Sequence, residues 1–106
     1  MIEVREYLNR EGRNLYNDWF DRLNSQAAAK VATALTRLAL GNVSNVKGVG
    51  SGVLELRIDF GPGYRVYFGK DGERLIILLG GGTKKRRDIN AAVADWEEYK
   101  RRKQER

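Results

Sequence analysis

Near the start of the chain, the hydrophobic positions change from a period of two to a helical period. Ile2 and Val4 alternate with charged residues and Tyr7 extends the pattern, which predicts a short first strand. From about Asn14 the apolar residues fall at helical spacing, which predicts a first helix. These apolar residues are Leu15, Tyr16, Trp19, Phe20 and Leu23.

A second helix is predicted directly afterwards. Asn24 or Ser25 can cap its first turn, and Gly41-Asn42 supplies the left-handed stop that helices favour. The apolar stripe between cap and stop consists of Ala28, Val31, Leu35 and Leu38. We therefore expect a helical hairpin with one apolar face on each helix.

The period returns to two after a Gly/Ser/Asn-rich segment, 41–52, which we expect to be a loop. Three strands joined by two turns follow. The strands are 53–60, 64–68 and 74–79, and the turns are 61–63 and 70–73. The last strand is apolar on both faces, as expected where a sheet is covered above and below.

Helical spacing marks the last part of the chain, and the residues 100–106 are expected to form a charged, frayed end. The helical positions are Ile89, Ala92, Val93, Trp96 and Tyr99. The order β-α-α-β-β-β-α predicts an α+β fold, in which a helical hairpin and a C-terminal helix pack on one face of a small, mainly antiparallel sheet. No linker or repeat interrupts the sequence, so residues 1–106 are expected to form a single domain.

Composition excludes several kinds of chemistry. The 106 residues include neither Cys nor His, so disulfides, thiol chemistry, His/Cys zinc sites and imidazole catalysis are ruled out. The carboxylates are scattered, and we expect neither a metal nor another cofactor. No apolar signal segment opens the sequence, and the longest apolar run, Leu75 to Leu79, is too short for a bilayer. These features predict a cytoplasmic protein with no membrane partner.

The charge balance favours a polyanionic partner. Lys and Arg number 20 against 14 Asp and Glu, a net charge of +6. Neutralising phosphates releases counterions and steers association, although ordinary solubility charge is the alternative explanation.

Two groups of cations can meet in the predicted sheet. If 61–63 is a three-residue turn, Asp59 opposes Arg65 and Arg57 opposes Tyr67, on the face turned away from the helices. A solvated Asp59–Arg65 ion pair is the alternative interpretation of this first group.

The second group is Thr83–Arg87, which follows three glycines and directly precedes the last helix. A helix N-terminus with free N–H groups and added cations is a natural site for an oxyanion, commonly phosphate, and a solvated basic turn is the alternative. Because strand 74–79 should neighbour the strand that carries Arg65, both groups can line one positive groove.

Such a groove suits RNA cleavage by in-line attack of a 2′-hydroxyl on the adjacent phosphate. Arg57 and Arg65 are the candidates for stabilising the transition state, and Lys84 is the candidate for binding phosphate or transferring a proton. Candidate RNA-binding residues are Lys85, Arg86, Arg87 and Tyr67.

Two of these positions have competing interpretations. Tyr67 can stack on a base or pack within the sheet. Glu55, beside Arg57, is either a general base or a residue that keeps a pleated surface soluble.

Three segments resemble a known family: Gly52–Ile58, the run GPGYRVYF at Gly61–Phe68, and Leu78–Lys84. Together with the upstream helices and Trp96, they are similar to the HigB-like addiction-module toxins, the "killer protein" branch of the RelE/ParE toxin superfamily. The resemblance covers nearly the whole chain and implies the same α+β fold.

The resemblance also implies a function: a ribosome-dependent endoribonuclease that cuts translated mRNA and is held inactive by an antitoxin, typically a helix-turn-helix protein. Arg65, in the Gly-Tyr-Arg motif, matches the arginine that contacts the scissile phosphate in RelE-type enzymes. Arg57 lies on a strand that carries basic catalytic residues, and Lys84 lies in a segment that supplies another. Glu55 and Asp59 depart from a more densely basic pattern, and the C-terminal catalytic tyrosine has no secure match.

Two other functions fit the same sequence. One is a non-enzymatic toxin, as in the ParE branch, that binds a protein target such as DNA gyrase. The other is a decayed or regulatory module that mainly binds its antitoxin.

Overall fold

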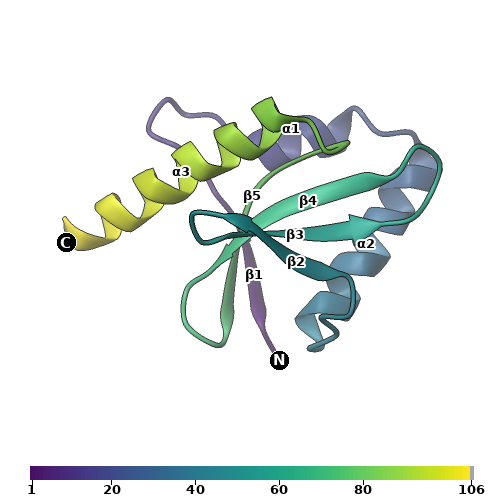
Figure 1. Ribbon diagram of the computed structural model, residues 1–106, viewed down its shortest axis with the longest axis horizontal. Coiled ribbons are helices and arrows are strands. Elements are labelled where there is room, and N and C mark those ends of the chain that lie inside the picture. Colours follow the sequence, from purple (N-terminus) through teal and green to yellow (C-terminus); the bar gives the residue numbers. More distant parts are fainter. Residues whose placement is uncertain (106) are drawn as a thin grey trace.

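The computed structural model describes residues 1–105 and contains a five-stranded sheet with helices on both faces (Figure 1). The strands are β1 (Glu3–Glu6), β2 (Val46–Gly50), β3 (Val53–Ile58), β4 (Tyr64–Lys70) and β5 (Leu75–Gly82), and the helices are α1 (Leu15–Asp21), α2 (Ser25–Ala39) and α3 (Arg86–Gln104). The strand order is β1-β5-β4-β3-β2, with β1 parallel to β5 and all other neighbours antiparallel. The predicted α+β class is confirmed. Within the described residues, no helix has the length and apolar character needed to cross a membrane.

Three segments differ from the prediction. The segment 41–52, predicted to be a loop, contains β2, whose pairing with β3 shifts register between Gly48 and Gly50. β5 continues through the glycines 80–82 instead of ending before them. α3 extends to Gln104, so most of the end predicted to fray is helical, and Arg106 lies outside the described residues.

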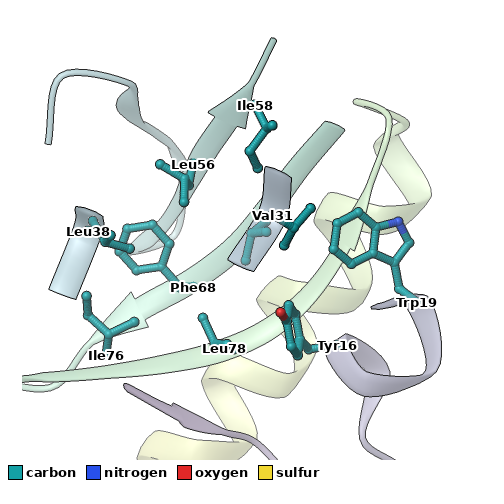
Figure 2. Close-up of a cluster of buried hydrophobic side chains, with 10 residues drawn as sticks. Tyr16, Trp19, Val31, Leu38, Leu56, Ile58, Phe68, Ile76 and Leu78 are labelled. Carbon is teal, nitrogen blue, oxygen red and sulfur yellow. The ribbon is translucent and has the colours of Figure 1, made fainter. Parts of the chain in front are cut away.

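α1 and α2 cover one face of the sheet. Each begins at an asparagine cap: the side chain of Asn14 accepts a hydrogen bond from the Asn17 amide, and that of Asn24 accepts one from the Ala27 amide. Apolar side chains from both helices and from three strands interlock beneath them (Figure 2). This core contains Tyr16, Trp19, Val31, Leu38, Leu56, Ile58, Val66, Phe68, Ile76 and Leu78.

α3 covers the opposite face, so the prediction that all helices pack on one face is wrong. Its buried residues Ile89, Ala92 and Trp96 meet a second apolar cluster that includes Ile77 of β5. Trp96 lies directly on Gly69 of β4, where an added Cβ would come within 2.5 Å of the indole ring. The strand predicted to be apolar on both faces is therefore buried between two layers of helices.

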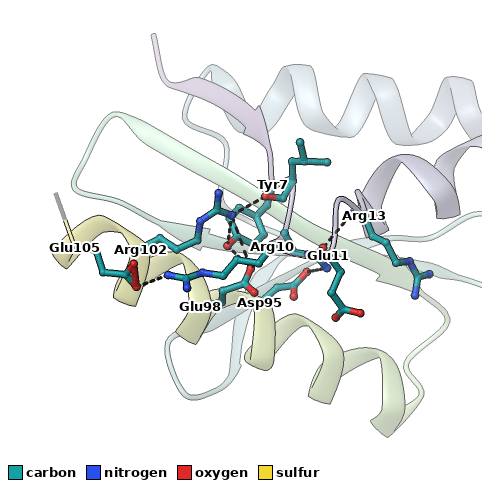
Figure 3. Close-up of polar contacts among 10 residues, drawn as sticks. Tyr7, Arg10, Glu11, Arg13, Asp95, Glu98, Arg102 and Glu105 are labelled. Carbon is teal, nitrogen blue, oxygen red and sulfur yellow. Dashed lines mark hydrogen bonds and ion pairs between the residues drawn. The ribbon is translucent and has the colours of Figure 1, made fainter.

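The C-terminal half of α3 is tied to the segment that follows β1 (Figure 3). The Tyr7 hydroxyl donates a hydrogen bond to Glu98 and accepts one from Arg102 at 3.1 Å. Arg10 forms an ion pair with Glu105 on the last turn of described chain. These contacts hold the C-terminal half of α3 in place. The first turn of α3, at the other end of the helix, lies next to the end of β5.

Candidate functional site

The connection between β3 and β4 determines which polar side chains meet on the α3 face. It is a five-residue loop, 59–63, and not a three-residue turn. Arg57 therefore lies directly opposite Arg65. The predicted pairings of Asp59 with Arg65 and of Arg57 with Tyr67 are wrong.

The register continues into β5 and forms a cross-strand row. Arg65 lies opposite Gly82, so Arg57, Arg65 and Gly82 follow one another across three adjacent strands. Adjacent strands lie about 4.8 Å apart, and Lys84 comes two residues after Gly82. The backbone thus gathers the two arginines and the beginning of the basic segment at one end of the sheet.

The two arginines of this row differ in exposure. The side chain of Arg57 is 49% exposed, and its Nε lies 3.6 Å from Oδ1 of Asp59. The side chain of Arg65 is only 14% exposed, and its Nη1 donates to the Tyr64 carbonyl at 3.3 Å. Two guanidinium groups placed opposite one another repel, so neighbouring carboxylates are needed to offset their charge.

Glu55 supplies a buried carboxylate beside this row. It lies opposite Lys47 on one side and Tyr67 on the other. Its side chain is 2% exposed, and its Oε2 lies 3.5 Å from Arg65 Nε and 3.6 Å from Lys47 Nζ. The interpretation as a residue that keeps the surface soluble requires an exposed side chain and is therefore wrong. Glu55 lines a pocket together with Arg57, so its role as a general base stays a prediction.

Tyr67 is also completely buried. Its ring has no exposed surface on which a base could stack, so the predicted RNA-stacking role is wrong and the packing alternative holds. Burial raises the pKa of the Tyr67 hydroxyl, and the charges of Glu55 and Asp88 raise it further, against opposing contributions from Arg65 and the Lys84 backbone.

Three buried side-chain polar atoms in the described part of the chain make no hydrogen bond, and all three belong to this cluster. They are Oε2 of Glu55, Nε of Arg65 and the hydroxyl oxygen of Tyr67. The Glu55 and Arg65 atoms form an ion pair with each other at 3.5 Å, but all three atoms lack the hydrogen bonds that buried polar atoms usually make. Local sacrifices of stability of this kind concentrate at functional sites.

The basic turn, residues 83–87, leads from β5 into α3. Lys84 adopts a left-handed φ of 76°, and Lys85 is the N-cap but makes no side-chain capping bond. The cations at 84–87 are exposed, and within residues 1–105 none of them forms an ion pair. Free N–H groups and unpaired positive charge at a helix N-terminus attract an oxyanion.

Asp88 connects the basic turn to the row of arginines. Its carboxylate lies on Gly82, where an added Cβ would overlap it. Glycine at this position lets the first turn of α3 approach the sheet closely. The basic turn therefore stands next to the end of the row.

Pockets lie on both sides of the arginine pair. Arg57, Glu55, Lys47, Ser44 and Asn45 line a pocket of about 160 Å³. Arg65 lines another, of about 340 Å³, formed by the loop 59–63. The site thus contains two pockets at neighbouring arginines, and the single positive groove stays a prediction. In the described residues, no group of three acidic side chains is arranged to hold a metal ion.

The sequence analysis missed Lys47 and did not foresee the burial of Glu55, which it had named as a candidate. Lys47 lies in β2, which was hidden within a predicted loop, and the burial of Glu55 depends on α3 covering its face. The available signal was strand 74–79: apolar residues on both faces require helices on both faces.

Comparison with known proteins gives one family. Residues 18–102 match the family described as "Phage derived protein Gp49-like (DUF891)". A relative from Haemophilus influenzae, named "Uncharacterized protein", is 43% identical over 74 residues, which cover 69% of this chain and 75% of the relative. The family match includes Arg57, Arg65 and the basic turn. The chain therefore belongs to the family of Gp49-like phage-derived proteins.

Proposed function

We propose that this protein is the toxin of a type II toxin–antitoxin system and acts as a metal-independent endoribonuclease on mRNA at the ribosome. The observation that carries the proposal is the cross-strand row of Arg57, Arg65 and Gly82 next to the unpaired cations of the basic turn. The resemblance of the GPGYRVYF segment to HigB-like toxins supports the same function.

The proposed reaction is in-line attack of a ribose 2′-hydroxyl on the adjacent phosphate, which yields a 2′,3′-cyclic phosphate and a 5′-hydroxyl end. The 2′-hydroxyl loses a proton, and the departing 5′ oxygen gains one. Arg57 and the exposed part of Arg65 stabilise the negative charge that develops on the phosphate. Lys84 binds that phosphate or transfers a proton.

The remaining cations of the basic turn extend the contact along the RNA. Lys85, Arg86 and Arg87 are exposed and bind neighbouring phosphates in this proposal. The proposed partners are the ribosome with its mRNA and a helix-turn-helix antitoxin, and the proposed location is the cytoplasm. The net charge of +6 supports a polyanionic partner.

Arg57→Ala in a translating extract tests the proposal. We expect mRNA cleavage to fall by about 100-fold or more, as when a donor to a developing oxyanion is removed. Arg57 is the better choice than Arg65, because replacing Arg65 would leave the Glu55 carboxylate buried without its partner. Arg74→Ala, which removes an exposed cation before β5, is the matched control and should cleave like the wild type.

Unchanged cleavage by Arg57→Ala would overturn the assignment. Intact mRNA with the wild-type protein, together with inhibited DNA supercoiling by gyrase, would instead identify a non-enzymatic ParE-like toxin. Harmless overexpression of the wild type would indicate a module that mainly binds its antitoxin.

A further inference from the structure

Glu55 is the most deeply buried carboxylate in the described residues, with 1% of its surface exposed. Removing a carboxylate from water is costly, and an apolar residue of similar size at this strand position would avoid the cost. Its Oε2 nevertheless completes no hydrogen bond. The compensation for its burial comes from ion pairs, one with the exposed Lys47 at 3.6 Å and one with a buried group at 3.5 Å.

That group is the Arg65 guanidinium, which is held on two sides. Glu55 Oε2 lies 3.5 Å from Nε, and the Tyr64 carbonyl accepts a hydrogen bond from Nη1 at 3.3 Å. Arg65 also lines the pocket over the loop 59–63. The guanidinium thus joins a buried anion to an open pocket, with its orientation set from the buried side.

The same carboxylate offsets repulsion within the site. Arg57 and Arg65 are cross-strand neighbours, and Lys47 is the cross-strand neighbour of Glu55 itself. Two other carboxylates lie near the row: Asp59, whose side chain is 77% exposed so that solvent screens its effect, and Asp88, which lies on Gly82 at the end of the row. Glu55 is therefore the buried counter-charge that allows two arginines to share one row.

We infer that Glu55 is a positioning residue, which orients the Arg65 guanidinium toward a substrate phosphate without touching the substrate. The inference rests on the proposed function and adds to it a residue whose role is separable from RNA binding. Glu55 holds Arg65, and the exposed cations hold the RNA.

Glu55→Gln separates the two roles, because it keeps the shape of the side chain and removes its charge. We expect the turnover number for RNA cleavage to fall roughly 10- to 100-fold, since a displaced guanidinium no longer meets the phosphate correctly. RNA affinity should stay the same or rise, because the substitution removes one negative charge from the site while every exposed cation remains. Glu73→Gln, which neutralises an exposed carboxylate before β5, is the matched control and should change neither quantity.

A signature that does not need catalysis accompanies this test. The Arg65 Nε–H is buried beside a carboxylate, so it should give a distinct, slowly exchanging resonance in a ¹⁵N spectrum of the wild type. Glu55→Gln should shift that resonance and speed its exchange. If Glu55→Gln does not fold, Glu55→Asp carries the same test, because it keeps the charge but draws it away from Nε.

The outcomes distinguish the inference from the function on which it rests. A wild type that cleaves no RNA defeats the proposed function. A wild type that cleaves, with a Glu55 variant that cleaves equally well or loses affinity in proportion to turnover, defeats the positioning role. Reduced turnover at retained affinity, with an altered Arg65 resonance, supports it.

Discussion

The two ends of α3 carry similar numbers of cations in opposite settings. At the C-terminal end, Lys103 Nζ lies 2.6 Å from Asp71, Arg102 lies 3.9 Å from Glu98, and Lys100 lies 3.2 Å from Glu97. At the N-terminal end, the cations at 84–87 have no ion-pair partner among the described residues, and the helix has no side-chain cap.

The helix dipole makes this contrast sharper. Cations stabilise the C-terminus of a helix and destabilise its N-terminus, each by about 0.3–1 kcal/mol near the surface. In its C-terminal half, α3 therefore uses positive charge to hold the helix against the segment that follows β1 and against the turn before β5. We call this half of α3 the fastened end. The N-terminal end of α3, with the cations at 84–87, is here called the near end. Its positive charge lowers stability, which is expected where charge serves binding. The number of cations does not distinguish holding the helix in place from binding a partner, but the presence or absence of ion-pair partners does.

The largest expected effect on stability comes from removing the buried apolar side chain that holds the fastened end on the sheet. Trp96 is 6% exposed, lies on Gly69 and stacks on Tyr99 with ring centroids 5.2 Å apart. Trp96→Ala should lower the free energy of unfolding by about 3–5 kcal/mol, measured by urea denaturation. Leu40→Ala, at a 70% exposed position, should change it by less than about 0.5 kcal/mol. A loss below about 1 kcal/mol at Trp96 would mean that α3 is held mainly by its ion pairs.

The second prediction is that one substitution at the near end raises stability and lowers RNA affinity. Lys85→Ser gives α3 the cap that it lacks and removes one cation, so the free energy of unfolding should rise by about 1 kcal/mol. RNA affinity should fall, and the slope of its logarithm against the logarithm of salt concentration should shrink by about 0.7 if one phosphate contact is lost. Lys100→Ser, at the fastened end, should lower stability slightly and leave RNA affinity unchanged. Stability and affinity moving in the same direction at Lys85 would contradict the contrast between the two ends.

The third prediction tests the hydrogen bonds of the fastened end. The Tyr7 hydroxyl donates to Glu98 and accepts from Arg102 (Figure 3). Tyr7→Phe should cost about 1 kcal/mol in the free energy of unfolding, the usual worth of such a bond. Tyr64→Phe is a suitable control, because its ring packs against the core on the opposite face of the sheet. RNA cleavage should be unaffected, and a large loss of cleavage in Tyr7→Phe would show that the two ends of α3 are coupled.

Much of the fold follows from hydrophobic spacing, and the exceptions have identifiable causes. Asn14 and Asn24 cap the helices because short polar side chains reach the first free N–H groups. β2 escapes detection because Gly48 and Gly50 flank a register shift, which breaks the alternation that marks a strand. The apolar strand 74–79 implies that helices cover both faces of the sheet. The predicted arrangement, with all helices on one face, did not use this signal and placed α3 on the wrong face.

The site was harder to predict, because register depends on loop length. Gly61-Pro62-Gly63 has the composition of a three-residue turn, yet Asp59 and Phe60 also leave the ladder, and the Phe60 carbonyl accepts a hydrogen bond from the Gly63 amide at 2.9 Å. The longer loop shifts the pairing by two residues, which keeps each side chain on its predicted face and changes its partner. Arg57 thus lies opposite Arg65, and Glu55 lies opposite Tyr67. No sequence pattern gives the length of this loop.

The smallest effects concern the pH dependence of the fastened end. Burial raises the pKa of the Asp95 carboxyl, against a hydrogen bond from Asn9 that lowers it. The hydrogen bond from Tyr7 lowers the pKa of Glu98, and those from Lys103 and Tyr99 lower that of Asp71. The folded state thus binds a proton at Asp95 more readily than the unfolded state does, and binds protons at the other two carboxylates less readily.

These opposite shifts give opposite contributions to stability. Asp95 destabilises the fold at neutral pH, and the penalty is relieved as the pH falls through its raised pKa toward the ordinary value of 3.8. Glu98 and Asp71 stabilise the fold above their ordinary values of 4.5 and 3.8, and their contributions are lost as the pH falls below them. The free energy of unfolding of Asp95→Asn, followed by urea denaturation from pH 7 downward, should therefore lack the gain that Asp95 gives the wild type as the pH falls toward 3.8, and should keep the losses from Glu98 and Asp71. A parallel pair of curves for the two proteins would show that Asp95 remains hydrated, and that the fastened end of α3 is as open to water as the basic turn.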